Sequence, residues 1–155
     1  MEDKQLQKLT ILPFLFCIIF TSCKDRPAKG LGLTSENKFF PCPETPNCVS
    51  SFENPSNERN FISPIKFFGG KEATILKLEK LIKKNPSAKI VEKKENYLRA
   101  EYTSSVFKFV DDIQFYFGQE NTIHVKSASR VGRSDFGKNR ERVREIEFAL
   151  QQSAN

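Results

Sequence analysis

The sequence predicts an α+β fold, a two-layer sandwich in which a mainly antiparallel sheet of about four to five strands packs against two helices. One observation is the order of the periodic segments, which is a helical segment, four strand-like segments and a second helical segment. The other is that short polar turns join the strand-like segments in pairs, as in β-hairpins. One sheet face should therefore pack on the helices, and the other should be solvated or form a groove.

The first helix is expected over Lys71–Lys84, and Asn85-Pro86 ends it because a proline restricts the residue before it. Its apolar side chains recur at helical spacing on one face, at Ile75, Leu78, Leu81 and Ile82. The closing helix is expected over Gly137–Gln151, with Asp135 or Ser134 as its N-terminal cap. Its buried face should hold Asn139, Val143, Ile146 and Leu150.

The strands are expected in two hairpins. Ala88–Lys93 and Tyr97–Thr103 are joined across Glu95-Asn96, and the second hairpin joins Val106–Phe117 to Thr122–Ser129 across residues 118–121. A short strand near 49–52 would add an edge to the sheet.

Length and composition exclude several classes of protein. A chain of 155 residues supports one domain, and 15 Phe are too many aromatic residues for a disordered chain. The only histidine, His124, is expected on the surface, and it argues against a multi-histidine metal site and a histidine-based catalytic triad. We expect no metal, no cofactor and no catalytic residue.

The N-terminal segment predicts export. The apolar run Leu9–Phe20 is too short to span a bilayer but suits a signal peptide. Phe20-Thr21-Ser22-Cys23 resembles the lipobox of bacterial lipoproteins, which implies a signal peptide over 1–22, cleavage before Cys23 and lipidation of its sulfur. The alternative is an ordinary secretory signal followed by a coincidental cysteine.

The remaining chain is expected to form a flexible tether over 23–38 and a single globular domain over 39–155. The protein would be lipid-anchored to a bacterial membrane and face the periplasm or the exterior. Its formal net charge of +6 therefore does not indicate a nucleic-acid partner.

Cys42 and Cys48 are the two cysteines left after cleavage and lipidation, and an oxidising compartment favours a disulfide between them. A metal site would need further ligands nearby, and a thiol oxidoreductase would more often carry Cys-x-x-Cys.

Polar residues interrupt the predicted apolar faces near the last strand. Strand alternation places Asp111, Ser127 and Ser129 on the face of the large hydrophobic residues, and helical spacing places Asn139 on the buried stripe. A bulge at Asp111-Asp112 would instead expose both carboxylates. If the register holds, Asp111 needs a cation, and Arg130 or Arg140 are the near candidates.

These positions predict one polar constellation at the junction of the last strand and closing helix: Asp111, Ser127, Ser129, Arg130, Asp135 and Asn139. It would be either a site that holds an anionic group or a structural hydrogen-bond network. Arg130 is even-numbered, whereas Asp111, Ser127 and Ser129 are odd-numbered, so strand alternation points its side chain to the opposite face. It could join the constellation only if the strand ends or bends near Ala128.

Several segments together are similar to the signature of the domain of unknown function 1499 family: CPETPNCVSS, AEYTS, FKFVDDIQF and SASRVGRSDFGKNRERV. The likeness covers about Phe40 to Leu150, and Arg133 and Phe136 stand where Tyr and Leu are commoner. The resemblance implies an exported, membrane-associated or chloroplast-targeted chain and carries no activity over. Its motif residues include Asn47, Ser50, Glu101, Thr103, Asp112, Gly132, Gly137 and Arg142, besides both cysteines and the constellation.

The function expected is that of an envelope lipoprotein whose non-catalytic domain binds a small anionic ligand, a lipid headgroup or a protein partner. The alternatives are an enzyme that uses Glu101, Asp111 and Arg130, and a purely structural role.

Overall fold

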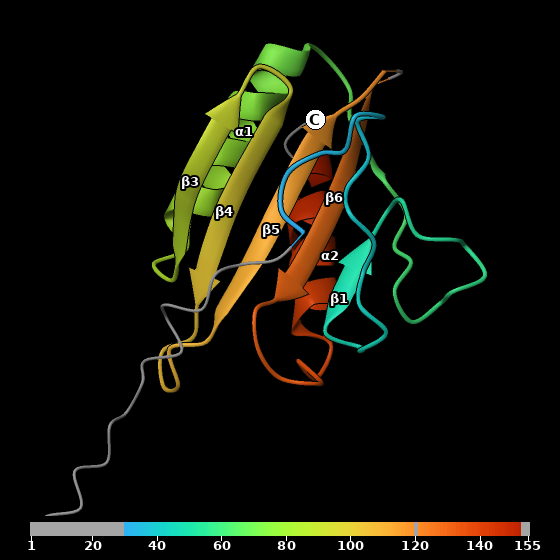
Figure 1. Ribbon diagram of the computed structural model, residues 1–155. Coiled ribbons are helices and arrows are strands. Elements are labelled where there is room, and N and C mark those ends of the chain that lie inside the picture. The colour runs from blue at the N-terminus through green and yellow to red at the C-terminus, as the bar shows by residue number, and fades with distance from the viewer. Residues whose placement is uncertain (1–29, 120, 153–155) are drawn as a thin grey trace, which may run out of the picture.

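The computed structural model describes residues 30–119 and 121–152, which form six strands and two helices (Figure 1). In chain order these are β1 (Cys48–Ser50), β2 (Ile65–Lys66), α1 (Lys71–Lys84), β3 (Ala88–Lys94), β4 (Tyr97–Thr103), β5 (Val110–Phe117), β6 (Thr122–Ser129) and α2 (Lys138–Gln152). All strand pairs are antiparallel, in the order β1-β6-β5-β4-β3, and β2 pairs with the beginning of β6. The predicted α+β class is confirmed, and the sheet has six strands where about four to five were expected.

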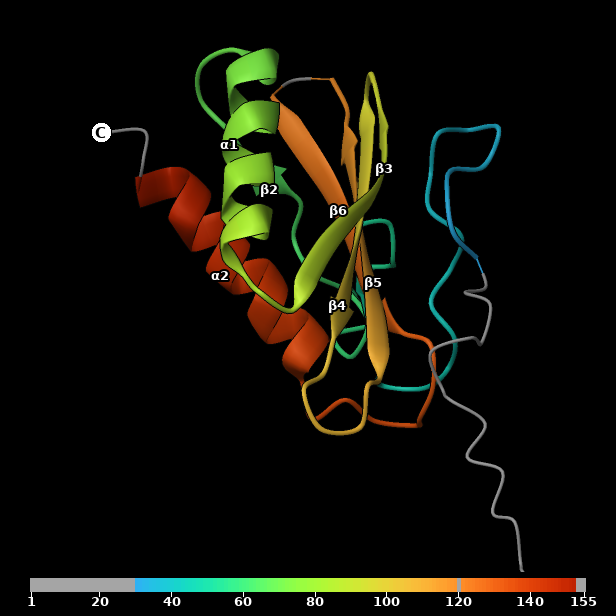
Figure 2. The same cartoon turned by 90° about the vertical axis from the view of Figure 1, so that its left-hand side faces the viewer.

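Both helices cover the same face of the sheet (Figure 2), which we call the inner face. The core lies between the two helices and this face of the sheet, and it includes Leu78, Phe115, Val125 and Val143, all fully buried. The opposite face, which we call the outer face, is covered in part by residues 30–47, drawn in blue and cyan in Figures 1 and 2. We call residues 30–47 the covering segment.

The register of β5 follows the predicted alternation. Ile113, Phe115 and Phe117 belong to the core, and Asp111 is paired with Ser129 across β6. The β5 ladder is continuous from residue 110 to 117, so the alternative of a bulge at Asp111-Asp112 is wrong.

The beginning of that strand was predicted wrongly. β5 starts at Val110, and residues 104–109 form a turn in which Ser104 N donates to Phe109 O over 2.8 Å. Lys108 has a φ of 56°, in the left-handed region, so the extended backbone cannot continue through it. Val106 and Phe107, expected inside the strand, are therefore exposed.

The segment 30–38 was predicted as part of a flexible tether, but from Gly30 onward it contacts the sheet. Gly32 N donates to Gln114 Oε1 over 2.7 Å, and Leu33 forms an isolated antiparallel bridge with Phe39. Half-buried backbone with specific partners belongs to the folded domain, which a composition rich in Gly, Ser and Lys does not reveal.

The predicted signal peptide over 1–22 and the lipidation site Cys23 lie outside the described residues. Within residues 30–119 and 121–152, no helix has the length and apolar character needed to cross a membrane.

Candidate functional site

Asn139 occupies the centre of a hydrogen-bond network on the inner face, which we call the inner-face network and which comprises Asp111, Ser127, Ser129, Asp135, Asn139 and Arg142. Asn139 has no exposed surface. Its Oδ1 accepts from Ser127 Oγ over 2.6 Å and from Arg142 Nη1 over 2.8 Å. Its Nδ2 donates to Ser129 Oγ over 3.0 Å and to the backbone oxygen of Asn47 over 3.1 Å.

Asp135 joins the same network from the loop before α2. Its Oδ2 accepts from Asn139 N over 2.7 Å and from Asn139 Nδ2 over 2.8 Å, and its Oδ1 accepts from Gly137 N over 3.0 Å. These bonds satisfy backbone N–H groups at the start of α2, which have no partner inside the helix.

The cation that pairs with Asp111 is Arg142 of α2, at 2.8 Å, and neither Arg130 nor Arg140. Arg142 also lies over the ring of Tyr102, 4.4 Å from its centroid, while Arg140 donates to two backbone oxygens of residues 58 and 59. Helical spacing brings Arg142 one turn after Asn139, so both face the end of the sheet. These polar groups satisfy one another, as the members of a structural hydrogen-bond network do.

Arg130 lies apart from this network, which corrects the predicted constellation. The strand alternation continues one residue beyond Ser129 without the bend that the prediction required, so the Arg130 side chain reaches the outer face. There its Nε donates to Asp112 Oδ2 over 2.7 Å, and its Nη2 donates to Asp112 Oδ1 over 3.0 Å and to Glu101. The same placement separates the three residues of the alternative enzyme hypothesis, since Glu101 and Arg130 lie on one face of the sheet and Asp111 lies on the other.

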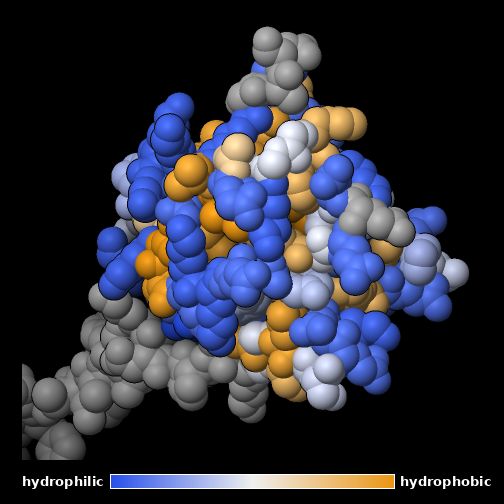
Figure 3. All heavy atoms as spheres, turned by 90° about the horizontal axis from the view of Figure 1, so that it is seen from above, coloured by the Kyte–Doolittle hydropathy of each residue, from blue (hydrophilic) through white to orange (hydrophobic). Residues whose placement is uncertain are grey.

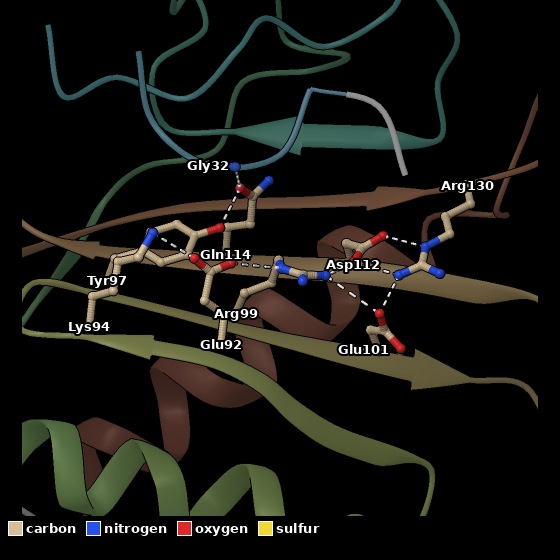
Figure 4. Close-up of polar contacts among 9 residues, drawn as sticks. All are labelled: Gly32, Glu92, Lys94, Tyr97, Arg99, Glu101, Asp112, Gln114 and Arg130. Carbon is tan, nitrogen blue, oxygen red and sulfur yellow. Dashed lines mark hydrogen bonds and ion pairs between the residues drawn. The ribbon is translucent and has the colours of Figure 1, made fainter. Parts of the chain in front are cut away.

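The outer face carries a second polar array, drawn in Figure 4, which the sequence analysis did not predict. Arg99 of β4 donates to Asp112 over 2.9 Å and contacts Glu92 and Glu101 at 3.4 Å each. We call these five residues, Glu92, Arg99, Glu101, Asp112 and Arg130, the outer-face ion pairs. Asp112 is 3% exposed, and the hydrogen bonds that it accepts from Arg130 raise the pKa of that guanidinium.

Gln114 and Tyr97 extend the array along the sheet. Tyr97 Oη donates to Gln114 Oε1 over 2.8 Å, and the same oxygen accepts from Gly32 N. Burial, followed by the nearby Glu92 carboxylate, raises the pKa of Tyr97 to about 12, so the phenol remains a donor at neutral pH.

Lys126 is a buried cation that joins the outer face to the segment covering it. Its ammonium donates to three backbone oxygens, those of Phe40 at 2.7 Å, Gly30 at 3.3 Å and Pro41 at 3.4 Å. Burial lowers the pKa of Lys126, an effect that the carboxylates of Glu53 and Asp112 oppose. The three carbonyls fill the donor capacity of the ammonium and fix the covering segment on β6.

Between the covering segment and β6 lies a cleft of about 560 Å³, the outer-face cleft. Its charged lining residues are Asp112, Lys126 and Arg130, so cations outnumber carboxylates on its wall. Ser129 and Gly132 also line it, at the end of β6. Arg130 uses Nε and Nη2 for its carboxylate partners, and Nη1 has no partner among the described residues; in Figure 4 this nitrogen points away from Asp112 and Glu101.

A smaller hollow of about 340 Å³ lies on the helix side, beside Tyr102, Arg142 and Glu145. There the guanidinium is engaged through both terminal nitrogens, because Arg142 Nη1 donates to Asn139 and Ser127 and Nη2 donates to Asp111. The outer-face cleft is therefore the better candidate for a ligand.

A disulfide between Cys42 and Cys48 closes one wall of the cleft, with a Cα–Cα distance of 5.7 Å. This pair was expected from the sequence. Cys42 N donates to Glu53 Oε1 over 2.7 Å, and Asn47 Nδ2 donates over 2.7 Å to the backbone oxygen of Gly132, which also lines the cleft.

Replacing both cysteines with serine is expected to reduce the free energy of unfolding by about 2 kcal/mol, because the short closed loop no longer restricts the unfolded chain. Urea unfolding of the C42S/C48S protein against wild type measures it. Addition of reductant should shift wild type toward the variant and leave the variant unchanged. A wild-type midpoint that reductant does not move would contradict the prediction.

His124 is half-buried on the outer face, whereas a surface position was expected. Its ring stacks on Phe52, with centroids 4.0 Å apart, and Ser51 Oγ lies 3.3 Å from Nδ1. Burial, followed by the charge of Lys66, lowers the pKa of His124, so the ring is neutral at pH 7. Ser51 Oγ also accepts from Val125 N over 3.0 Å, which fits a packing role.

The polar residues of the outer-face cleft have a signal in the sequence, because they recur at even-numbered positions. The even-numbered residues of β5 and β6 include Asp112, Gln114 and Lys126, which share one face in the register observed, and Arg130, directly after β6, reaches Asp112 on that face. Such residues are ordinarily read as a solvated face, and only the covering segment turns that face into a cleft.

Comparison with known proteins identifies the family. The sequence model of a family described as "Protein of unknown function (DUF1499)" matches residues 38–150. The chain belongs to the DUF1499 family. The DUF1499 match ends within α2 and covers both polar networks, together with the cleft lining from Pro41 onward, while Gly30 and Leu31 of the cleft lie before it. No match was found among curated proteins or among solved structures.

Within the described residues of this DUF1499 domain, no group of three or more His, Cys, Asp and Glu side chains is arranged to hold a metal ion.

Proposed function

We propose that this DUF1499 protein is a lipid-anchored protein of a bacterial envelope whose domain binds a small anionic ligand in the outer-face cleft, without catalysis. The observation that carries the proposal is the cleft itself, with the unpaired Nη1 of Arg130 on a wall where cations outnumber carboxylates among the described residues. Such a nitrogen provides a charge-assisted donor for a phosphate or carboxylate oxygen.

The surroundings hold that donor in place before a ligand arrives. Asp112 and Glu101 fix the guanidinium by three hydrogen bonds, and Lys126 and the disulfide fix the opposite wall. A preformed cleft with few polar anchors is typical of small-ligand sites, because little side-chain freedom is lost on binding. Lipidation at Cys23 is supported by the short apolar run that ends in Thr21-Ser22-Cys23.

Binding is tested by isothermal titration calorimetry with sn-glycerol 3-phosphate, and in a second arm with a short-chain phosphatidylglycerol. Ala128 lines the cleft, and its replacement by Phe fills the space without removing a charge. We expect saturable binding to wild type and loss of binding in A128F. Preference for the first probe indicates a free anion, and preference for the second a lipid headgroup.

The matched control is Ala73→Phe, because Ala73 is exposed on α1, on the other side of the molecule. A73F should bind like wild type. Absence of binding to either probe, or equal binding by A128F, would contradict the proposed site. The proposed anchor is tested separately by mass spectrometry of the membrane fraction, where an acylated Cys23 peptide is expected and an unmodified one would contradict it.

A further inference from the structure

Two loops leave the sheet at the same end, and both carry exposed hydrophobic residues. Residues 104–109 lead into β5 and residues 130–137 follow β6, and the antiparallel pairing of Asp111 with Ser129 places both loops at one end (Figures 1 and 2). Arg130 N donates to Val110 O over 3.0 Å where the two loops begin. This end therefore brings together segments that are more than 20 residues apart in the chain.

The exposed side chains at this end are unusually apolar. Phe136 is 95% exposed, Val106 is 76% and Phe107 is 71%, and the Phe107 ring stacks on Phe109 with centroids 5.5 Å apart. We call Val106, Phe107, Phe109 and Phe136 the aromatic tip. Single exposed hydrophobic residues are common on soluble proteins, but several gathered at one end mark an interaction surface.

The backbone presents these side chains outward. Phe136 has a φ of 54°, which is uncommon for a bulky residue, and the hydrogen bonds from Phe136 N to Ser134 Oγ and from Gly137 N to Asp135 Oδ1 hold the turn. Phe109 N donates to Ser104 Oγ over 2.9 Å, which closes the other loop. Folding thus fixes the rings in solvent and does not bury them.

Unpaired basic residues accompany the aromatic tip. In the chain, Lys108 stands between Phe107 and Phe109, and Arg133 stands three residues before Phe136. Both basic residues are exposed, and neither has an ion-pair partner among the described residues. Apolar side chains flanked by Lys and Arg match the interface of a bilayer that contains anionic lipid.

The opposite end of the molecule has a different surface. Seen from that end (Figure 3), hydrophilic residues, in blue, cover most of the surface, and hydrophobic residues, in orange, lie between them. Phe68 is exposed there beside the β5–β6 turn, since Phe67 N donates to Asn121 O over 3.0 Å.

We propose that the aromatic tip inserts into the interface of an anionic lipid bilayer, an orientation that rests on the membrane attachment proposed above. The chain between Cys23 and Gly30 spans at most about 25 Å when fully extended, so a lipid anchor at Cys23 would hold the domain close to the bilayer. The tip then decides which end faces the lipid. It gives the anchored protein a second contact with the bilayer, in addition to the lipid on Cys23.

The test uses tryptophan as a depth probe, because the chain has no Trp of its own. Full chain carrying Phe107→Trp is expressed in a bacterial host, extracted and reconstituted in vesicles of phosphatidylethanolamine and phosphatidylglycerol, with and without brominated acyl chains. We expect a blue-shifted emission that brominated lipid quenches for the most part. Phe136→Trp should respond in the same way, and the matched control Phe68→Trp should keep a solvent-exposed, unquenched emission.

Emission from the Phe107→Trp and Phe136→Trp proteins that matches the Phe68→Trp control would overturn the proposal. A blue shift that is already present without lipid, together with a cross-linked dimer, would overturn it in favour of contact with a second copy of the chain. Failure of the anchor is distinguishable, because wild type would then appear in the soluble fraction. Vesicles added to that fraction still test the tip, where quenching of the Phe107→Trp protein supports insertion and its absence refutes it.

Discussion

Asn139→Ala is expected to lower the free energy of unfolding by about 3 kcal/mol and the melting temperature by about 10 °C. The amide of Asn139 is fully buried and bonds to residues of β6, of the loop before β1 and of the α2 N-terminus. Alanine leaves Ser127 Oγ and the backbone oxygen of Asn47 with fewer partners in a buried site, which carries the full desolvation cost. Urea and thermal unfolding followed by circular dichroism measure the effect.

The control is Arg144→Ala, an exposed change on the same helix, which should stay within about 0.5 kcal/mol of wild type. If the inner-face network is structural, N139A keeps its affinity for sn-glycerol 3-phosphate when measured well below its melting temperature. A stable N139A protein that has lost binding would instead assign the ligand to the inner face.

Arg130→Met is expected to lower the free energy of unfolding by about 3 kcal/mol, because it leaves the Asp112 carboxylate, which is 3% exposed, with Arg99 as its remaining ion-pair partner among the described residues. Methionine keeps most of the apolar stem and removes only the charged group. The measurement is urea unfolding of R130M beside wild type.

The double variant Asp112→Asn with Arg130→Met controls for the loss of packing. It removes both charges, so it should be less destabilised than the sum of the two single changes. Additive effects would show that Asp112 and Arg130 do not stabilise one another, in contradiction to their hydrogen bonds.

Much of the inner face could be predicted because its signal is local. Period-two alternation places Asp111 among Ile113, Phe115 and Phe117, and helical spacing places Asn139 on the buried face of α2. The ion-pair partner of Asp111 was missed, although the same spacing favours it. Arg142 follows Asn139 by one turn and shares its face of α2, whereas the expected Arg140 is rotated away from Asn139 by about 100°.

The outer face was harder to predict because it depends on a segment with no periodic signal. Residues 30–38 have the composition of a linker, yet the backbone oxygen of Gly30 accepts from Lys126 and the Gly32 N–H donates to Gln114. A face of charged residues is solvated by default, and it becomes a cleft only when distant chain covers it. The two-residue strand β2 escapes prediction for a related reason, since its pairing with β6 and not its length makes it a strand.

The alternation of side chains between the two faces continues one residue beyond the end of β6, at Arg130. From the sequence, Arg130 could join the inner constellation only if the backbone bent near Ala128, which the nearby Gly132 made plausible. The backbone bends only after the strand, at residues 130–131, and Gly132 follows with a φ of 88°, so the Arg130 side chain reaches the outer face. The exposed Phe107 was placed in a strand because the turn at Lys108 uses no glycine or proline.

The most direct test of the central claim, that the outer-face cleft binds a small anion, is an amide NMR titration with sn-glycerol 3-phosphate. The cleft predicts saturable shifts confined to its lining, at Gly30, Thr45, Asn47 and residues 128–132, together with a shift of the Arg130 side-chain N–H signals. The Asn139 side-chain amide should not move. Shifts centred on Asn139 and Arg142, or the absence of saturable shifts anywhere, would contradict the account.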